Sequence, residues 1–388
     1  MYDQAFFDAR LYRMGTRSLK WDLCRAEHGA DTLPMWVADM DFMSPTEVTE
    51  ALLRRAAHPA YGYTVTMPDD TQALLDFWKR RHGLEMQAED VTALPCVVTG
   101  LKAAIRALTA PGDGVIIQSP VYGPFHQSVE VTRRTLMDAP LQRDAAGRYH
   151  MDLAAVERCC QAGARLMLLC SPHNPVSRVW AEWELYALLE VLNRYRVPLV
   201  SDEIHANFVY APNVFVPLLS LQRENALSLC AASKTFNLAG LQQASCLCAD
   251  RRLRLAFQAE IEASGVMSGN LFALEATRAA YQHGDAWLDG LLAYLDGNRL
   301  TLAACLREAL PSAILTPIDA TYLAWIDLNA YRLSTEALTR RCEAAKVAFT
   351  GGTFFGEDSG EGFIRFNFGC PRAQIPEAVR RLRMAVLG

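Results

Sequence analysis

The chain has 388 residues, of which 51% are hydrophobic and 21% are charged. Because a domain holds about 150 residues, this length predicts two domains or three and excludes a single small module. The 38 Lys and Arg residues against 43 Asp and Glu residues give a formal net charge of −5, with no long basic block, so no nucleic acid is expected as a partner.

The N-terminal residues differ from a secretion signal. Asp3 and Asp8 stand where such a signal carries positive charge followed by an apolar run. The sequence also contains no run of eighteen apolar residues, so no membrane-spanning helix is predicted. The eleven cysteines lie partly in apolar runs and lack histidines at zinc-ligand spacing, which predicts reduced thiols and no structural metal. We therefore expect a cytoplasmic protein with no membrane partner.

Short apolar runs alternate with longer amphipathic stretches in the middle of the chain. This pattern is typical of an α/β core, in which crossover helices cover both faces of a mostly parallel sheet. Helices are expected at Leu101–Thr109 and at Glu182–Tyr195, where leucines recur at helical spacing. The expected buried strands are Gly114–Gln118, Arg165–Cys170, Pro198–Ser201 and Ser228–Ala231.

The C-terminal third predicts a smaller α+β domain. Residues 270–310 are helix-forming except at Gly284, which we expect to end one helix before Asp285 caps the next, giving a hinge between domains. Strand-like runs at 322–327 and 362–368 precede a closing helix. We predict a large domain of residues 45–284 and a small domain of residues 1–44 and 285–388.

Polar side chains follow three of the predicted strands. Lys234 comes after the strand that ends at Ala231, and Asp202 and Asn174 follow two others. Open α/β sheets bind ligands outside these strand ends. A lysine there is costly unless it is neutralised, paired or used covalently, for instance as a Schiff base with an aldehyde cofactor. Lys234 alone would be interpreted as a loop cation, but the three together indicate a site.

These residue types suit pyridoxal 5′-phosphate. A carboxylate (Asp202) beside the pyridine nitrogen keeps it protonated, an amide (Asn174) steadies the phenolate oxygen, and a lysine (Lys234) holds the aldehyde and moves protons. His205 would lie near the same ring, although an ordinary histidine at a strand end is as good an interpretation. Tyr122, after the strand 114–118, is a candidate to stack on the ring or a core residue.

The remaining groups of cofactor and substrate are anions. Thr99, Gly100 and Leu101 stand at a predicted helix start, where free amides favour a phosphate, and Ser233 is a second donor. Arg365 lies among aromatic residues of an alternating strand, where its charge is costly without an anion such as a substrate α-carboxylate. The alternative is an arginine at the sheet edge whose charge reaches solvent.

The chain resembles the fold-type I pyridoxal-phosphate enzymes of the aminotransferase class I/II group, and within them the MalY/PatB-type cystathionine β-lyases. The resemblance covers nearly the whole length, in segments 20–21, 33–42, 61–63, 120–125, 171–175, 201–206, 233–241 and 365–372. It implies a seven-stranded, mostly parallel sheet in the large domain. It also implies a homodimer with shared active sites.

The same resemblance assigns roles to residues. It implies that Lys234 is the Schiff-base lysine, Asp202 the pyridine-nitrogen partner, Asn174 the phenolate donor, Tyr122 the stacking ring and Arg365 the carboxylate clamp. Further assignments are Tyr63 at the neighbouring subunit's phosphate, Ala38 and Asn174 at the substrate, and Trp36, Tyr61 and Phe354 as candidates for the distal wall.

Two positions depart from common patterns of the group. His205 stands where many aminotransferases carry tyrosine and the lyase-like subgroup carries histidine, which favours elimination. Ser177 replaces a glycine of the pattern Asn-Pro-x-Gly-Arg, so serine must tolerate or avoid a backbone angle that is easy for glycine. We predict a β-lyase that splits L-cystathionine or another cysteine S-conjugate. The alternatives are an aminotransferase for hydrophobic amino acids and a regulatory binding protein.

Overall fold

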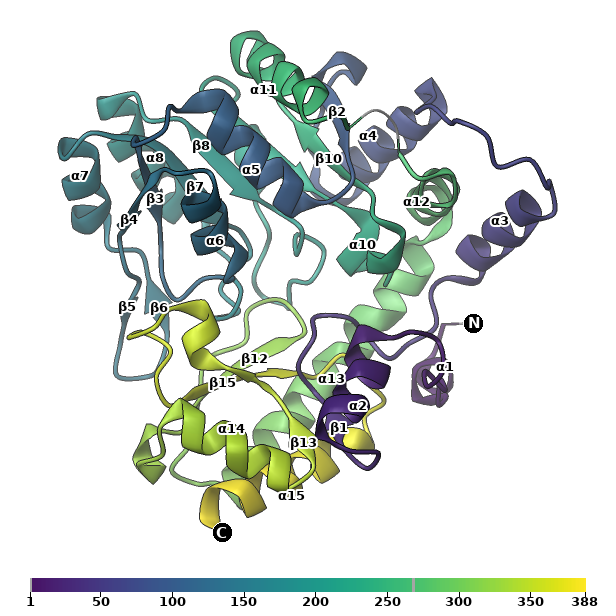
Figure 1. Ribbon diagram of the computed structural model, residues 1–388, viewed down its shortest axis with the longest axis vertical. Coiled ribbons are helices and arrows are strands. Elements are labelled where there is room, and N and C mark those ends of the chain that lie inside the picture. The colour runs from purple at the N-terminus through teal and green to yellow at the C-terminus, as the bar shows by residue number, and fades with distance from the viewer. Residues whose placement is uncertain (1, 267–268) are drawn as a thin grey trace.

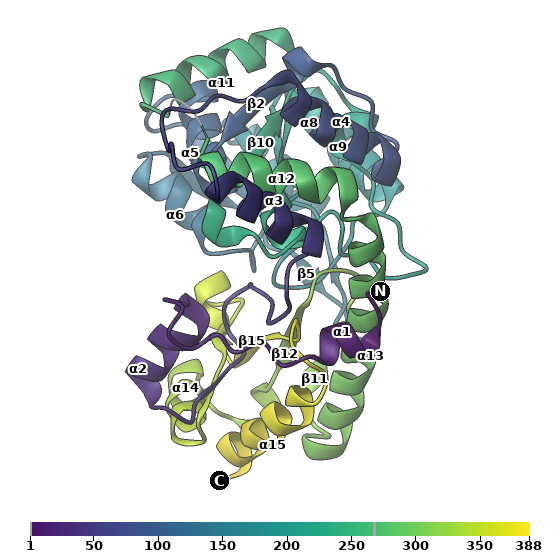
Figure 2. The same cartoon turned by 90° about the vertical axis from the view of Figure 1, so that its right-hand side faces the viewer.

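The computed structural model describes residues 2–266 and 269–388. Figure 1 shows two lobes, the upper one built on a seven-stranded sheet and the lower one on a four-stranded sheet. Helix α13 (Asp285–Ala309) runs from the upper lobe along the side of the lower one, as the turned view in Figure 2 shows. Within the described residues, no helix is both long enough and apolar enough to span a bilayer.

The large sheet is mostly parallel, as predicted. Five adjacent strands run parallel, and the sixth is antiparallel both to the last of these and to the seventh, which forms the other edge. In spatial order the strands are β2 (Val91–Leu94), β10 (Ala244–Leu247), β9 (Ala226–Cys230), β8 (Leu199–Asp202), β7 (Ala164–Cys170), β3 (Gly114–Ile117) and β4 (Thr135–Asp138).

The sheet is buried because helices cover both of its faces. Val115 and Ile117 point to one face and Ile116 to the other, as strand alternation requires, and all three are fully buried. One face packs against α5 (Val97–Leu108), α6 (Pro124–Val131) and α11 (Arg251–Ala263). The other packs against α7 (Leu153–Gln161), α8 (Glu182–Tyr195) and α9 (Leu218–Leu221).

Helix α12 (Leu271–His283) packs in the upper lobe against α3 (Thr46–Ala56) and α4 (Pro68–His82).

The helix break before α13 falls at Gly284 as predicted, but the prediction that Asp285 caps α13 was wrong. Gly284 itself occupies the cap position, and the Asp285 carboxylate pairs with Arg80 at 2.6 Å instead. The proposed hinge and the domain limits stay predictions.

The lower lobe is a smaller α+β unit. Its antiparallel sheet has the order β11 (Ile314–Leu315), β12 (Leu323–Asp327), β15 (Phe363–Asn367) and β14 (Thr350–Gly351). The N-terminal segment joins it because β1 (Leu33–Pro34) pairs with β13 (Val347–Ala348). The remaining helices are α1 (Gln4–Asp8), α2 (Cys24–His28), α14 (Thr335–Ala344) and α15 (Gln374–Leu387), and a hairpin of β5 (Gln142–Arg143) and β6 (Tyr149–His150) extends from the upper lobe.

Candidate active site

A pocket of about 200 Å³ lies at the carboxyl ends of the central strands. Asn174 follows β7, Asp202 ends β8, and Lys234 lies in the short helix α10 (Ala232–Thr235) directly after β9. The structure thus brings together the three side chains that the strand ends predicted. Seven of the predicted residues line the pocket: Ala38, Tyr122, Asn174, Asp202, His205, Ser233 and Lys234.

The amine of Lys234 faces a turn of the N-terminal segment, and its Nζ donates a hydrogen bond to the Ala38 carbonyl at 2.7 Å. Loss of solvation and the nearby Arg365 cation lower the pKa of Lys234 to about 8, while Asp39 and Asp202 act in the opposite direction. A lysine at its ordinary pKa is almost wholly protonated at pH 8. At pH 8 about half of the Lys234 side chains are therefore neutral and can act as nucleophiles.

Asp202 is a buried carboxyl without a cationic partner in hydrogen-bond contact. Its side chain is 4% exposed, and its one side-chain hydrogen bond within the described residues comes from the Ile204 amide at 3.1 Å. Burial raises the pKa of Asp202 to about 7, against the opposing effects of that amide and of Lys234. A ligand that brings a protonated ring nitrogen would supply the missing charge.

His205 lines the same pocket as a neutral imidazole. Burial, together with the cations of Lys234 and Arg365, lowers the pKa of His205 to about 3. Its ring stands edge-on to Tyr322 with the centroids 6.1 Å apart, and the buried Nδ1 has no hydrogen-bond partner in the described part of the chain. Such an unpartnered buried nitrogen is suited to a polar group of a bound ligand.

Arg365 is buried beside the pocket without a carboxylate. Its guanidinium donates to Asn174 Oδ1 at 3.2 Å and to the Trp36 carbonyl at 2.9 Å, and it lies 4.9 Å from the centre of the Phe355 ring. Burial lowers its pKa to about 10, and Nε has no partner among the described residues. An uncompensated buried arginine is costly, and a planar carboxylate would accept its free hydrogen bonds.

The helix α5 begins four residues before the predicted start, so the predicted phosphate donors lie within the helix and not at its first residue. Thr99, Gly100 and Leu101 do not line the pocket; Cys96, Val97 and Val98 of the same segment do. The Gly100 amide is not free, because it donates to the Cys96 carbonyl at 3.2 Å within the helix. A Cβ at Gly100 would lie 2.9 Å from both Leu94 and Leu229, so this glycine allows the helix to pack closely on the sheet.

The aromatic candidates are divided between the pocket and the surface. Tyr122 lines the pocket, and burial raises its pKa. Phe354 lies beside it, with ring centroids 6.2 Å apart, and is 43% exposed. The Trp36 indole is half-buried and donates to the Lys20 carbonyl. Tyr61 and Tyr63 lie outside the pocket; Tyr61 is 61% exposed and the Tyr63 side chain is fully exposed.

Ser177 has the backbone angle that its replacement of glycine suggested. Its φ is +55°, in the left-handed region that costs an ordinary residue about 1–2 kcal/mol. The side chain offsets part of this cost, since its hydroxyl hydrogen-bonds the Leu323 carbonyl and lies 3.2 Å from the Thr321 hydroxyl. The main-chain oxygen accepts from Asp319 and Ala320 amides, so serine keeps this loop closed against the lower lobe.

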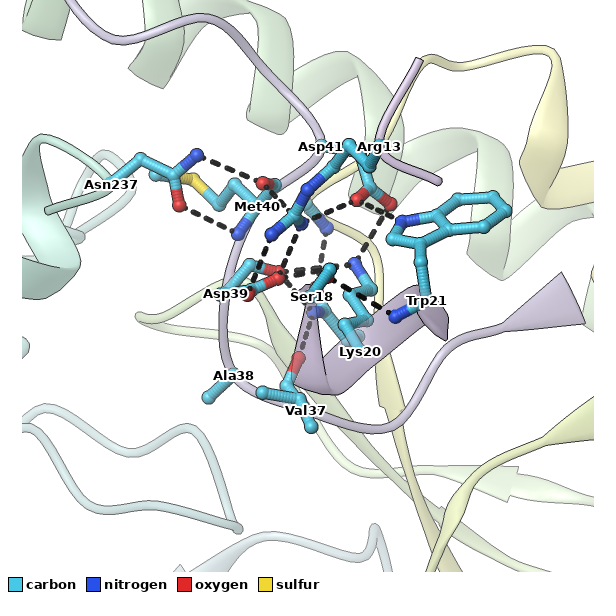
Figure 3. A network of polar contacts seen from close by, with 12 residues as sticks. Arg13, Ser18, Lys20, Trp21, Val37, Ala38, Asp39, Met40, Asp41 and Asn237 are labelled. Atoms are coloured by element: carbon cyan, nitrogen blue, oxygen red, sulfur yellow. Dashed lines mark hydrogen bonds and ion pairs between the residues drawn. The ribbon is translucent and has the colours of Figure 1, made fainter. Parts of the chain in front are cut away.

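The turn that receives Lys234 is held by a buried ionic network, which Figure 3 shows. Lys20 is fully buried and its Nζ contacts Asp41 Oδ2 at 2.8 Å and the Asp39 carbonyl at 3.1 Å. Arg13 bridges the carboxylates of Asp39 and Asp41 at 2.7 and 2.8 Å. Trp21 donates its indole N–H to Asp41. These contacts neutralise the acids of the turn and fix its backbone.

Comparisons with known proteins agree with this arrangement. Residues 31–382 match the family model described as aminotransferase class I and II. The chain is 39% identical to cystathionine beta-lyase PatB of Bacillus subtilis, over 98% of this chain and 99% of PatB, and 33% identical to the protein MalY of Escherichia coli, over 96% and 97%.

A solved structure leads to the same family. Cystalysin from Treponema denticola, a crystal structure that contains pyridoxal 5′-phosphate, superimposes with a TM-score of 0.94 at 30% identity, covering 98% of each chain. The full-length matches confirm the resemblance inferred from the motifs and the fold-type I architecture. This chain belongs to the aminotransferase class I and II family.

Proposed function

We propose that this protein is a pyridoxal-phosphate-dependent carbon–sulfur β-lyase acting on L-cystathionine or another cysteine S-conjugate. The reaction takes up one water and yields a thiol, pyruvate and ammonia. The names of PatB and of a C–S lyase from Staphylococcus hominis, at TM-score 0.91 and 28% identity, support this class of reaction. The observation that carries it is the half-neutral amine of Lys234 opposite a buried acid and beside a buried arginine that lacks a carboxylate.

The residues present fit the cofactor. When bound, pyridoxal phosphate supplies an aldehyde for amines and a ring that withdraws electrons from the α-carbon of the substrate. Asp202 would face the ring nitrogen, Asn174 the phenolate oxygen and Tyr122 the ring plane. The amides at Cys96–Val98 and the Ser233 hydroxyl would hold the phosphate, at the start of the twelve-residue helix α5.

The substrate is held and deprotonated by two side chains. Arg365 binds the α-carboxylate through the N–H groups that no carboxylate of the chain occupies, which orients the α-hydrogen toward Lys234. Nζ of Lys234, which is about half neutral at pH 8, accepts that proton, and the Ala38 carbonyl holds the amine in place meanwhile. Because His205 is neutral, it adds no positive charge to the pocket. The proton on Lys234 is then available to the departing sulfur.

The first prediction concerns cofactor loading. Apoprotein mixed with pyridoxal phosphate should gain visible absorbance at a rate that rises with pH and levels off above about 8, because only the neutral amine of Lys234 attacks the aldehyde. Stopped-flow absorbance from pH 6 to pH 10 measures this. A rate that keeps rising tenfold per pH unit up to pH 10 would contradict the lowered pKa.

The second prediction concerns the carboxylate clamp. Arg365→Leu should raise KM for cystathionine by about 100-fold, because charge-assisted hydrogen bonds of about 1.5–3 kcal/mol are lost. Arg365→Lys should recover only a small part, since an ammonium cannot bind a carboxylate through two parallel N–H groups. Arg340, 71% exposed on α14, provides the control variant Arg340→Leu. Equal KM values for Arg365→Leu and Arg340→Leu would show that Arg365 does not bind the substrate carboxylate.

The proposed reaction is tested by quantifying both products. Holoenzyme is incubated with L-cystathionine and a panel of cysteine S-conjugates, and pyruvate and thiol are measured without any keto acid. We expect the two in equal amounts. Product formation only after a keto acid is added would show an aminotransferase instead. Cofactor binding without turnover of any amino acid would favour a regulatory protein.

The wider assignments are part of the same proposal. We place the large domain at residues 45–284 and the small domain at residues 1–44 and 285–388, in a cytoplasmic homodimer. The exposed Tyr63 supports a dimer, because the extended segment around it presents several apolar side chains to solvent, among them Tyr61, Val65 and Met67. In that dimer Tyr63 would contact the phosphate bound by the other subunit.

A further inference from the structure

The turn of residues 36–42 receives hydrogen bonds from both sides of the proposed active site. From the upper lobe, Lys234 donates to the Ala38 carbonyl at 2.7 Å. From the lower lobe, Arg365 donates to the Trp36 carbonyl at 2.9 Å, and Tyr322 donates to Ala38 at 3.0 Å. The two proposed catalytic side chains therefore rest on carbonyls only two residues apart.

Each of these side chains is followed by an asparagine that binds the same turn. Asn237, three residues after Lys234, accepts from the Met40 amide at 3.0 Å and donates to the carbonyls of Met40 and Phe42 at 2.9 and 3.0 Å. Its φ of +61° lies in the left-handed region, which asparagine tolerates better than most residues. The turn is thereby fastened to the segment that carries Lys234.

Asn367 makes the corresponding contacts from strand β15. It lies two residues after Arg365, so both side chains point to the same face of the strand. Its Nδ2 donates to the carbonyls of Val37 and Asp39, the latter at 2.8 Å, and its Oδ1 accepts from the Gly369 amide. The side chain is fully buried, and both its nitrogen and its oxygen are hydrogen-bonded. It fastens the turn to the strand that carries Arg365.

We infer that Asn237 and Asn367 are positioning residues that together set the spacing between the Lys234 amine and the Arg365 guanidinium. This inference rests on the proposed function, in which Arg365 holds the α-carboxylate and Lys234 removes the proton of the adjacent carbon. One covalent bond separates those two substrate groups, so the spacing of the protein groups must match it closely. A misplacement of about 1 Å costs about 100-fold in rate.

The turn can serve as the shared reference because it is itself rigid. The buried Lys20 and Arg13 bind its two carboxylates, Asp39 and Asp41, as Figure 3 shows. With both asparagines in place, six carbonyls of residues 36–42 accept a hydrogen bond from a side chain of another segment. Without Asn237, the side-chain hydrogen bond that remains from the upper lobe among the described residues is that of Lys234. Without Asn367, the lower lobe still binds the turn through Arg365, Thr350 and Tyr322, but the contacts to Val37 and Asp39 are lost.

The test uses Asn237→Gly and Asn367→Ala holoenzymes and the double variant. Glycine preserves the positive φ of residue 237, so only the side-chain contacts are lost. We expect Asn367→Ala to act mainly on KM, which should rise about tenfold. Asn237→Gly should act mainly on kcat, with a fall of about tenfold, and should shift the pH at which the cofactor absorbance changes. The double variant should lose less than the product of the two single losses, because one turn carries both effects.

Two matched controls separate positioning from stability. Asn298 is equally buried, and its side chain is hydrogen-bonded to the Phe368 and Cys370 carbonyls and to Arg372 rather than to residues 36–42. Asn225 has a φ of +57° far from the pocket. Asn298→Ala and Asn225→Gly should change urea midpoints as much as the test variants while leaving kcat and KM within about twofold. Two results would overturn the inference. One is a change in kcat and KM that follows the urea midpoint across all variants, and the other is a double variant whose loss of kcat/KM equals the product of the two single losses.

A binding measurement tests the positioning role of the asparagines independently of whether the enzyme is a lyase or an aminotransferase. The affinity of holoenzyme for L-alanine, followed by cofactor absorbance without a keto acid, depends on the carboxylate clamp whichever reaction follows. Asn367→Ala should weaken it about tenfold and Asn298→Ala should not. If wild-type enzyme forms no pyruvate from cystathionine but these affinities differ as stated, the lyase assignment fails and the positioning role stands. Equal affinities would overturn the positioning role.

Discussion

Lys234→Ala should abolish the visible absorbance of bound pyridoxal phosphate and lower kcat for cystathionine by at least about 10⁴-fold. The variant loses the amine that binds the aldehyde and the group that moves the α-proton, and these two contributions act on the same step. The described lining of the pocket offers no replacement, because His205, with a pKa of about 3, is a very weak base, and Asp202 faces the ring nitrogen in our proposal.

The absorbance and pyruvate formation are measured on the same preparation, with Lys79→Ala as the control. Lys79 pairs with Glu85 on the surface of α4 and is 64% exposed. Borohydride reduction of wild-type holoenzyme followed by peptide mapping adds an independent readout. The chain has lysines at positions 20, 79, 102, 234 and 346, and only the peptide with Lys234 should carry the cofactor. Label on another lysine, or full activity of Lys234→Ala, would refute the assignment.

Asp202→Asn should lower kcat by about 10²–10³-fold, because a neutral amide no longer keeps the ring nitrogen protonated. The same substitution should stabilise the apoprotein. Burial raises the pKa of Asp202 from 3.8 to about 7, so the folded state holds a proton that the unfolded state has released. Stability therefore falls as the pH rises from about 4 to about 7.

At pH 8 the ionised and buried Asp202 costs the apoprotein free energy that asparagine does not, and Asp202→Asn should gain roughly 2–4 kcal/mol. Urea unfolding of both apoproteins at pH 4 and pH 8 checks this. The gain should fall below about 1 kcal/mol near pH 4, where Asp202 is protonated in the folded state and only about half ionised in the unfolded state. The pKa of Glu203 is also raised to about 7, mainly by burial and to a lesser extent by the Asp202 charge. Glu203 therefore titrates in the same pH range, and the part of its effect that comes from burial is common to both proteins. A gain of equal size at pH 4 would contradict the titration of Asp202.

The central sheet and its strand-end residues could be predicted because they depend on local pattern. Apolar runs buried on both faces gave β3, β7, β8 and β9 to within two residues, and the position of Asp202 and Lys234 follows directly from those ends. The edge strand β4 was missed, since its residues 135–138 are mostly exposed and lack a continuous apolar run.

Other parts of the site depend on contacts that no local pattern contains. The start of α5 was placed too late because Gly100 was interpreted as a phosphate-binding glycine, whereas it provides room for Leu94 and Leu229. The roles of Asn237 and Asn367 arise from their contacts with a turn 195 and 328 residues away. Both asparagines lie in the motifs that carried the family resemblance, which was the one available signal, but their spacing does not reveal a shared partner.

The N-terminal turn also has a consequence for biosynthesis. A ribosome releases the turn first and strand β15 almost last, and Arg365 reaches Trp36 across 329 residues of sequence. A nascent chain that has completed the large sheet already contains the pocket-lining residues 38–243 but still lacks Arg365, so it could bind the vitamin before it could bind a substrate. Because a ligand stabilises the state it binds, vitamin supply should determine how much newly made protein escapes degradation.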